Sequence, residues 1–182
     1  MQVKLHWLWI WLISIAGSDN MGGRVGVRDT LAKFLANPPI CNLNQVFTSF
    51  PKRINFQVNA QPGQMTRSAV VVFIAQEREN RLAIGGSHSG WKRVDYTVIL
   101  QIYCHSLHTN SEDSMADFDT LIDNIKERLR SDHNFGDESG VLVWQGAEPV
   151  IVGRYGEPAT SKEGATDIFA ELEFDVTEMI QA

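Results

Sequence analysis

The residues of this chain that could bind a metal ion are cysteine and histidine side chains near its centre. They are Cys104, His105 and His108, with His88 and His133 as possible further ligands. Zinc requires three or four ligands that converge in a tetrahedron. Cys104 and His105 are neighbours in a segment that alternates like a β-strand, so their side chains are expected on opposite faces. We therefore expect a core cysteine beside surface histidines, with no metal and no cofactor.

Two other groups could take part in catalysis. Ser87-His88-Ser89 places a histidine between serines, but it lies in a glycine- and serine-rich loop without the third group or the rigid geometry of a triad. The acidic residues at the start of a predicted helix are placed to stabilise its dipole: Glu112, Asp113, Asp117 and Asp119. The sequence contains no phosphate-binding Gly-Lys loop, dinucleotide glycine fingerprint, G-x-S-x-G elbow or C-x-x-C pair. We expect that the protein is not an enzyme.

An acidic stripe on the last predicted strand is the remaining candidate. Glu171, Glu173 and Asp175 alternate with apolar residues and so share one face of that strand. Two interpretations stay open. The stripe is either an ordinary solvated face, or a surface that repels phosphate, such as the wall of a channel that carries DNA.

The element that positions most of these groups is the predicted strand over residues 91–105. One face of this strand is apolar and consists of Val94, Tyr96, Val98, Leu100, Ile102 and Cys104. The other face carries Arg93, Asp95, Thr97, Ile99, Gln101, Tyr103 and His105. We expect this strand in the middle of the sheet, with ends that project beyond it or bend, because it exceeds the usual strand length.

The other elements define the fold class. The helical patterns cover residues 25–36 and 114–130, and the strand patterns cover 54–58, 68–76, 81–84, 141–144, 149–152 and 168–177. Residues 77–80 are expected to turn the chain, and residues 85–90 to form a loop tip. The order predicts an α+β fold with a mostly antiparallel sheet, two main helices packed on one face and a long hairpin tip.

Length and charge limit the possible functions further. With 182 residues, of which 43% are hydrophobic, the chain can bury one core, and we expect a single domain over residues 21–182. A net charge of −6 argues against general nucleic-acid binding. The apolar segment 1–20 has three interpretations: sequence upstream of a true start at Met21, a signal peptide cleaved at Ser14-Ile15-Ala16, or a segment at a membrane interface.

The order of elements, together with three segments, resembles the tail-terminator proteins of long-tailed phages, which are also called tail-completion or head–tail joining proteins. The segments are VDYTVILQIYCHS (94–106), MADFDTLIDNIKERLRSD (115–132) and ATDIFAELEFDVTEMI (165–180). The resemblance covers residues 21–182 and depends on element order rather than on a short motif. It implies a homohexameric ring that caps the tail tube, ends tube polymerisation and presents a docking surface to the head connector.

The resemblance also implies partners and a location. The partners are further copies of the chain, the tail tube protein and the head connector or stopper protein, while DNA passes through the lumen without specific binding and no membrane is involved. The protein would be part of the virion, at the tail end near the neck, after assembly in the host cytoplasm. Residues 1–20 depart from the family, because assembly in the cytoplasm needs no export signal.

Three surfaces fit these roles. The face of Asp95, Thr97, Ile99, Gln101 and Tyr103 mixes polar and apolar groups, as subunit interfaces do. The tip with Gly85, Gly86, His88 and the possible anchor Trp91 would contact the tube or a neighbouring subunit. The acidic stripe of Glu171, Glu173 and Asp175 would face the lumen.

Two alternative functions stay open. One is a head-side connector, stopper or neck protein within the same class. The other is an exported domain that binds a small molecule or a protein, which predicts cleavage after Ala16 and a monomer in solution.

Overall fold

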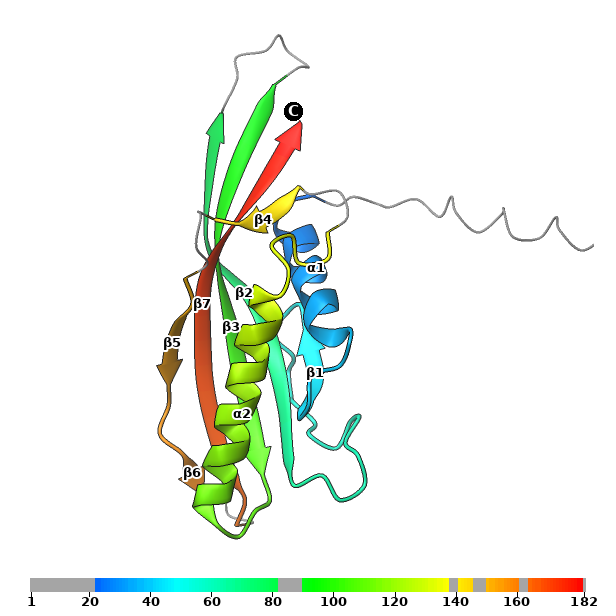
Figure 1. The fold of residues 1–182 in the computed structure, drawn as a ribbon, viewed down its shortest axis with the longest axis vertical. Helices are drawn as coiled ribbons and strands as arrows, with labels where there is room; N and C mark the ends of the chain where they lie inside the picture. Colours follow the sequence, from blue (N-terminus) through cyan, green and yellow to red (C-terminus); the bar gives the residue numbers. More distant parts are fainter. Residues whose placement is uncertain (1–21, 82–89, 138–140, 146–149, 161–163, 182) are drawn as a thin grey trace, which may run out of the picture.

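A computed structural model gives the structure of the protein and describes residues 22–81, 90–137, 141–145, 150–160 and 164–181. Over these residues the chain forms two helices and a seven-stranded mixed sheet (Figure 1). The elements are α1 (Arg24–Ala36), β1 (Leu43–Phe47), β2 (Thr66–Arg81), β3 (Trp91–Ser106), α2 (Ser111–Arg130), β4 (Leu142–Trp144), β5 (Val152–Tyr155), β6 (Ala159–Thr160) and β7 (Thr166–Gln181). The predicted α+β class is confirmed.

The long strands β2, β3 and β7 form the centre of the sheet. The strand order is β1-β2-β3-β7-β4, and β5 and β6 also pair with β7. The pair β1–β2 is parallel, and the other pairs are antiparallel. Because β3 pairs along its whole length with β7 and almost all of it with β2, its predicted central position is confirmed.

The core lies between the sheet and the two helices, which Figure 1 shows on the same side of β2, β3 and β7. We call this side of the sheet the helix face and the opposite side the open face. The helix face of β3 consists of the alternating apolar residues predicted from the sequence, from Val94 to Cys104, and all are buried. The helix α2 buries the matching stripe of Phe118, Leu121, Ile122, Ile125 and Leu129.

Helix α1 is held to the sheet by a buried carboxylate. Glu178 of β7 is 5% exposed, and its two oxygens accept the backbone N–H of Gly23 at 3.1 and 3.0 Å. Its Oε2 also accepts the hydroxyl of Tyr96 at 2.9 Å. Gly23 has a φ of 83°, a conformation that glycine adopts without strain. The negative charge therefore lies at the positive end of α1.

Three predicted elements are wrong. The strand expected at residues 149–152 is not formed at residues 150 and 151, and β5 begins only at Val152. Residues 54–58 were expected to form a strand, but they form turns, in which Asn55 accepts the backbone N–H of Gln57 through its side chain and that of Val58 through its carbonyl. Residues 77–80 were expected to turn the chain, but β2 continues to Arg81 because its backbone still pairs with β3. The predicted hairpin tip, with Gly85, Gly86 and His88, lies outside the described residues.

The ends of β2, β3 and β7 project beyond the helices (Figure 1). We call residues 79–81, 91–93 and 179–181 the projecting end. A β-bulge in β2 lies below it, where the register shifts between Ile74 and Gln76. Arg24 of α1 donates a hydrogen bond from Nη2 to the carbonyl of Ile74 at 3.3 Å. The bulge thus marks the level at which α1 begins.

Candidate functional site

The predicted subunit face and the predicted acidic stripe are parts of one surface. In the register of β3 and β7, Thr97 lies opposite Asp175, Ile99 opposite Glu173, and Gln101 opposite Glu171. All of these side chains belong to the open face, because their neighbours along each strand are buried against the helices. Sequence reasoning treated the two groups as separate, since it gave no register between the strands.

Hydrogen bonds join the polar side chains of this surface across the two strands. The pairs are Thr97 Oγ1 to Asp175 Oδ1 at 2.7 Å, Gln101 Nε2 to Glu171 Oε1 at 2.9 Å, and Thr177 Oγ1 to Asp95 Oδ1 at 2.7 Å. On β3, the side chains from Asp95 to Tyr103 on this face are half-buried. The open face is therefore an ordered polar surface rather than a set of freely solvated side chains.

An arginine that the sequence reasoning missed partly neutralises the acidic stripe. Arg154 of β5 places Nη1 at 2.7 Å from Glu173 Oε2 and 3.9 Å from Glu171 Oε2. Asp175, in contrast, is exposed and accepts a hydrogen bond from Thr97. The only sequence signal for this arrangement was a basic residue in a predicted loop, and pairing of β5 with β7 brings it into place.

The projecting end carries several charged side chains and one tryptophan. Arg93 contacts Asp95 at 2.7 Å, and Lys92 contacts Glu79 at 3.1 Å. Trp91, the predicted anchor, is 48% exposed. It lies on the open face, because Val94 and Tyr96 alternate with it on the helix face.

A hollow with aromatic walls lies at the opposite end of the open face. The connection between β1 and β2 crosses this face, with Phe50 against Phe73 (ring centroids 5.5 Å apart) and Phe56 stacked on His105 (5.2 Å). The hollow has a volume of about 560 Å³. Its apolar lining includes Phe50, Ile54, Phe56, Val71, Tyr103 and Phe169, and its charged lining consists of Lys52, Arg53, Glu157 and Asp167. Sequence reasoning missed it because five separate segments build it.

The candidate metal ligands do not converge. Cys104 is buried on the helix face, whereas His105 lies on the open face with Nδ1 2.7 Å from Asp167 Oδ1. Within the described residues, no three His, Cys, Asp or Glu side chains are grouped to hold a metal ion. His88 lies outside these residues. Burial, and to a smaller extent the negative charges of Asp117 and Asp167, raise the pKa of the Cys104 thiol to about 12.

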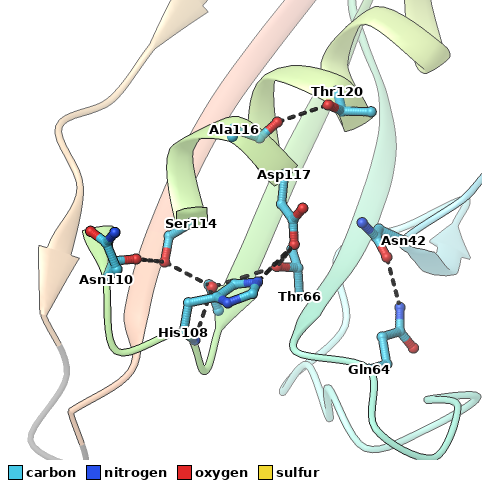
Figure 2. Close-up of polar contacts among 10 residues, drawn as sticks. Asn42, Gln64, Thr66, His108, Asn110, Ser114, Ala116, Asp117 and Thr120 are labelled. Atoms are coloured by element: carbon cyan, nitrogen blue, oxygen red, sulfur yellow. Dashed lines mark hydrogen bonds and ion pairs between the residues drawn. The ribbon is translucent and has the colours of Figure 1, made fainter. Parts of the chain in front are cut away.

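A cluster of polar side chains joins the start of α2 to the ends of β2 and β3 (Figure 2). Asp117 Oδ2 accepts hydrogen bonds from Thr66 Oγ1 and from His108 Nε2, the latter at 3.0 Å. Ser106 Oγ donates to Ser114 Oγ at 2.9 Å, and both serines are buried. The cluster connects two strands and a helix.

The geometry of this cluster does not match a catalytic triad. The ring of His108 contacts Asp117, but it is the backbone N–H of His108 that reaches Ser106, at 3.4 Å. A triad needs a ring nitrogen at hydrogen-bond distance from the nucleophile. Asp117, predicted to stabilise the dipole of α2, therefore also accepts hydrogen bonds that fix the helix to the sheet.

The chain was compared with protein-family models and with curated proteins. No protein-family model matches it, and no curated protein matches it. Among the residues that the structure describes, no helix is both long and apolar enough to cross a membrane. The element order and the open face are therefore the basis for inferring a function.

Proposed function

We propose that this chain is a non-enzymatic assembly protein with the role of a phage tail terminator. Copies of the chain form a ring on the tail tube, end its polymerisation and give the head connector a surface to bind. The ring has six subunits, it belongs to the virion at the tail end near the neck, and DNA passes through it.

The observation that carries this proposal is the open face, with strands that project past the helices. Both helices cover the other side of the sheet, so β3 and β7 present a half-buried polar surface without a second layer of helices. The side chains on this surface are already hydrogen-bonded in pairs, so that a partner can cover them without leaving polar groups unsatisfied. Mixed polar and apolar surfaces of this kind are typical of protein–protein interfaces.

Further parts of the proposal concern the fold. Arg81 of β2 pairs with Lys92 of β3, and we propose that the residues between them form a hairpin tip. The proposal also includes a mostly antiparallel sheet, in which the pairing of β1 with β2 is the parallel exception. The lumen role belongs to the acidic stripe of Glu171, Glu173 and Asp175 on β7, of which Asp175 is the exposed member.

Native mass spectrometry and electron microscopy of the full chain test this function. We expect six-subunit rings, and we expect that the protein limits tube length when it is added to polymerising tail tube protein. Replacing Ile99→Lys on the open face should prevent ring formation, because a charge would be buried in the contact. Thr120→Lys, at an exposed position of α2, is the control and should leave the rings intact.

Other results would point elsewhere. A monomer at high concentration, with no effect on tube length, would rule out the proposal. Cleavage after Ala16 together with a monomer would favour the exported binding domain. Rings that bind a head connector but leave tube length unchanged would favour a connector or stopper protein.

A further inference from the structure

The hollow with aromatic walls is large enough for one bulky side chain. Its volume of about 560 Å³ is within the range of pockets that bind small molecules or side-chain anchors. Phe50 on its wall is 55% exposed, so the apolar surface of the hollow is open to a partner. Tyr103 and Phe169, with ring centroids 5.1 Å apart, supply aromatic surface contributed by β3 and β7.

Trp91 is an exposed aromatic side chain on the same face of the same strand. Twelve residues separate it from Tyr103, which corresponds to about 40 Å along a strand. Because β3 is paired on both sides over this length, the two ends of the strand cannot approach one another. Trp91 therefore cannot enter the hollow of its own copy, but it can enter that of another copy.

The charges around Trp91 and the hollow favour this contact. On the open face near Trp91, the cations Arg78 and Arg93 outnumber the carboxylate of Asp95, which lies opposite Arg78 and contacts Arg93. The hollow is asymmetric: Glu157 and Asp167 lie on its β6–β7 side, and its two basic residues belong to the connection between β1 and β2. A tip that approaches over β6 and β7 brings cations against carboxylates.

We propose that Trp91 of one copy inserts into the hollow with aromatic walls of a second copy, with Arg78 and Arg93 toward Glu157 and Asp167. This inference rests on the proposed function, because both require self-association, and it deepens that function by naming the contact. A tryptophan that fills a desolvated pocket is the kind of residue that dominates an interface energetically. The contact joins two different surfaces, as required for a closed ring.

Two single variants of the full chain test the contact. Trp91→Ala removes the anchor, and Ala159→Trp fills the hollow from an exposed position of its lining. We expect each variant to weaken self-association at least tenfold in sedimentation equilibrium. Val150→Ala is the control, because Val150 is an exposed apolar residue (68%) outside the hollow, and it should associate like the unmodified chain. Circular dichroism shows whether each variant is folded.

Mixing the two variants gives a second, independent readout. Trp91→Ala keeps an intact hollow and Ala159→Trp keeps an intact anchor, so that the mixture should form a 1:1 complex although neither variant assembles alone. If Trp91→Ala assembles as well as the unmodified chain, the inference is wrong while the proposed function stands. If the unmodified chain stays monomeric, both are wrong. Binding of a small apolar dye that Ala159→Trp abolishes, with assembly unchanged, would show that the hollow is a small-molecule site instead.

Discussion

Glu178 shows how one buried side chain connects three parts of the molecule. It belongs to β7, accepts a hydrogen bond from Tyr96 on β3, and accepts the N–H of Gly23 at the start of α1. Hydrogen bonds to an ionised acceptor are stronger than those between neutral groups. Burial raises the pKa of Tyr96 above its usual range, and the charge of Glu178 raises it further. The phenol therefore stays protonated and donates to the carboxylate.

Replacing Glu178→Ala should lower the free energy of unfolding by about 2–3 kcal/mol, because the buried Tyr96 hydroxyl and the half-buried Gly23 N–H lose their acceptor. Urea denaturation measures this change. The matched control is Glu79→Gln, which removes the carboxylate from an ion pair with Lys92 at the surface and should cost less than about 1 kcal/mol. Equal effects of the two substitutions would show that Glu178 contributes no more to stability than a surface ion pair does.

At the scale of elements, the helix α2 depends on its first turn. Asn110 is the N-cap, and its side-chain oxygen accepts the backbone N–H of Glu112 at 3.0 Å. The helical pattern in the sequence instead placed the start of this helix at residue 114. Ser114 is one turn inside the helix, where its hydroxyl donates to the carbonyl of Asn110 at 3.2 Å. Capping preferences alone did not distinguish two polar residues four positions apart.

The substitution Asn110→Ala should destabilise the protein by about 1 kcal/mol, since one N–H at the start of α2 loses its side-chain acceptor. Asn110→Asp is the control and should retain most of the stability, because a carboxylate can accept the same bond at the positive end of the helix. Thermal unfolding followed by circular dichroism compares the two. A loss as large for aspartate as for alanine would contradict this role of the side chain.

The sequence was sufficient for elements whose burial pattern repeats over many residues, such as β3 and α2. It failed where a pattern was short or where charge was mistaken for a turn. Residues 54–58 alternate like a strand, but their backbone groups bond within turns. Residues 77–81 are mostly charged, yet they stay extended because β3 continues beside them. The hollow was not predictable, because it requires the relative positions of β2, β3, β7 and a connection.

At the scale of the whole molecule, the core is organised around the central strand. Cys104, 2% exposed, lies on this strand, so solvent reaches its thiol when the sheet opens. Because the pKa of Cys104 is raised in the folded protein, the free energy of this opening depends on pH. The folded protein keeps the proton up to about pH 12, whereas an unfolded chain releases it near the ordinary value of 9.0.

The free energy of unfolding should therefore fall as pH rises above 9, by about 1.4 kcal/mol per unit, because only the unfolded chain releases the proton. Below pH 9 this contribution is fully present. Urea denaturation of the unmodified chain and of Cys104→Ala at pH 8, 9 and 10 measures the effect, and the variant should show a smaller slope. Identical slopes would show that the thiol does not titrate in this way.

The bulge of β2 at Ala75 has a geometrical consequence for everything beyond it. Side chains of a strand alternate, so that if Ala75 paired with β3 like its neighbours instead of bulging out, positions 76–81 would exchange their two sides. Arg78 would then point toward α1, and Glu77 away from Arg24, which it now approaches to 3.8 Å. One extra amino acid, left unpaired, thus sets the direction in which the protruding ribbon presents its charges.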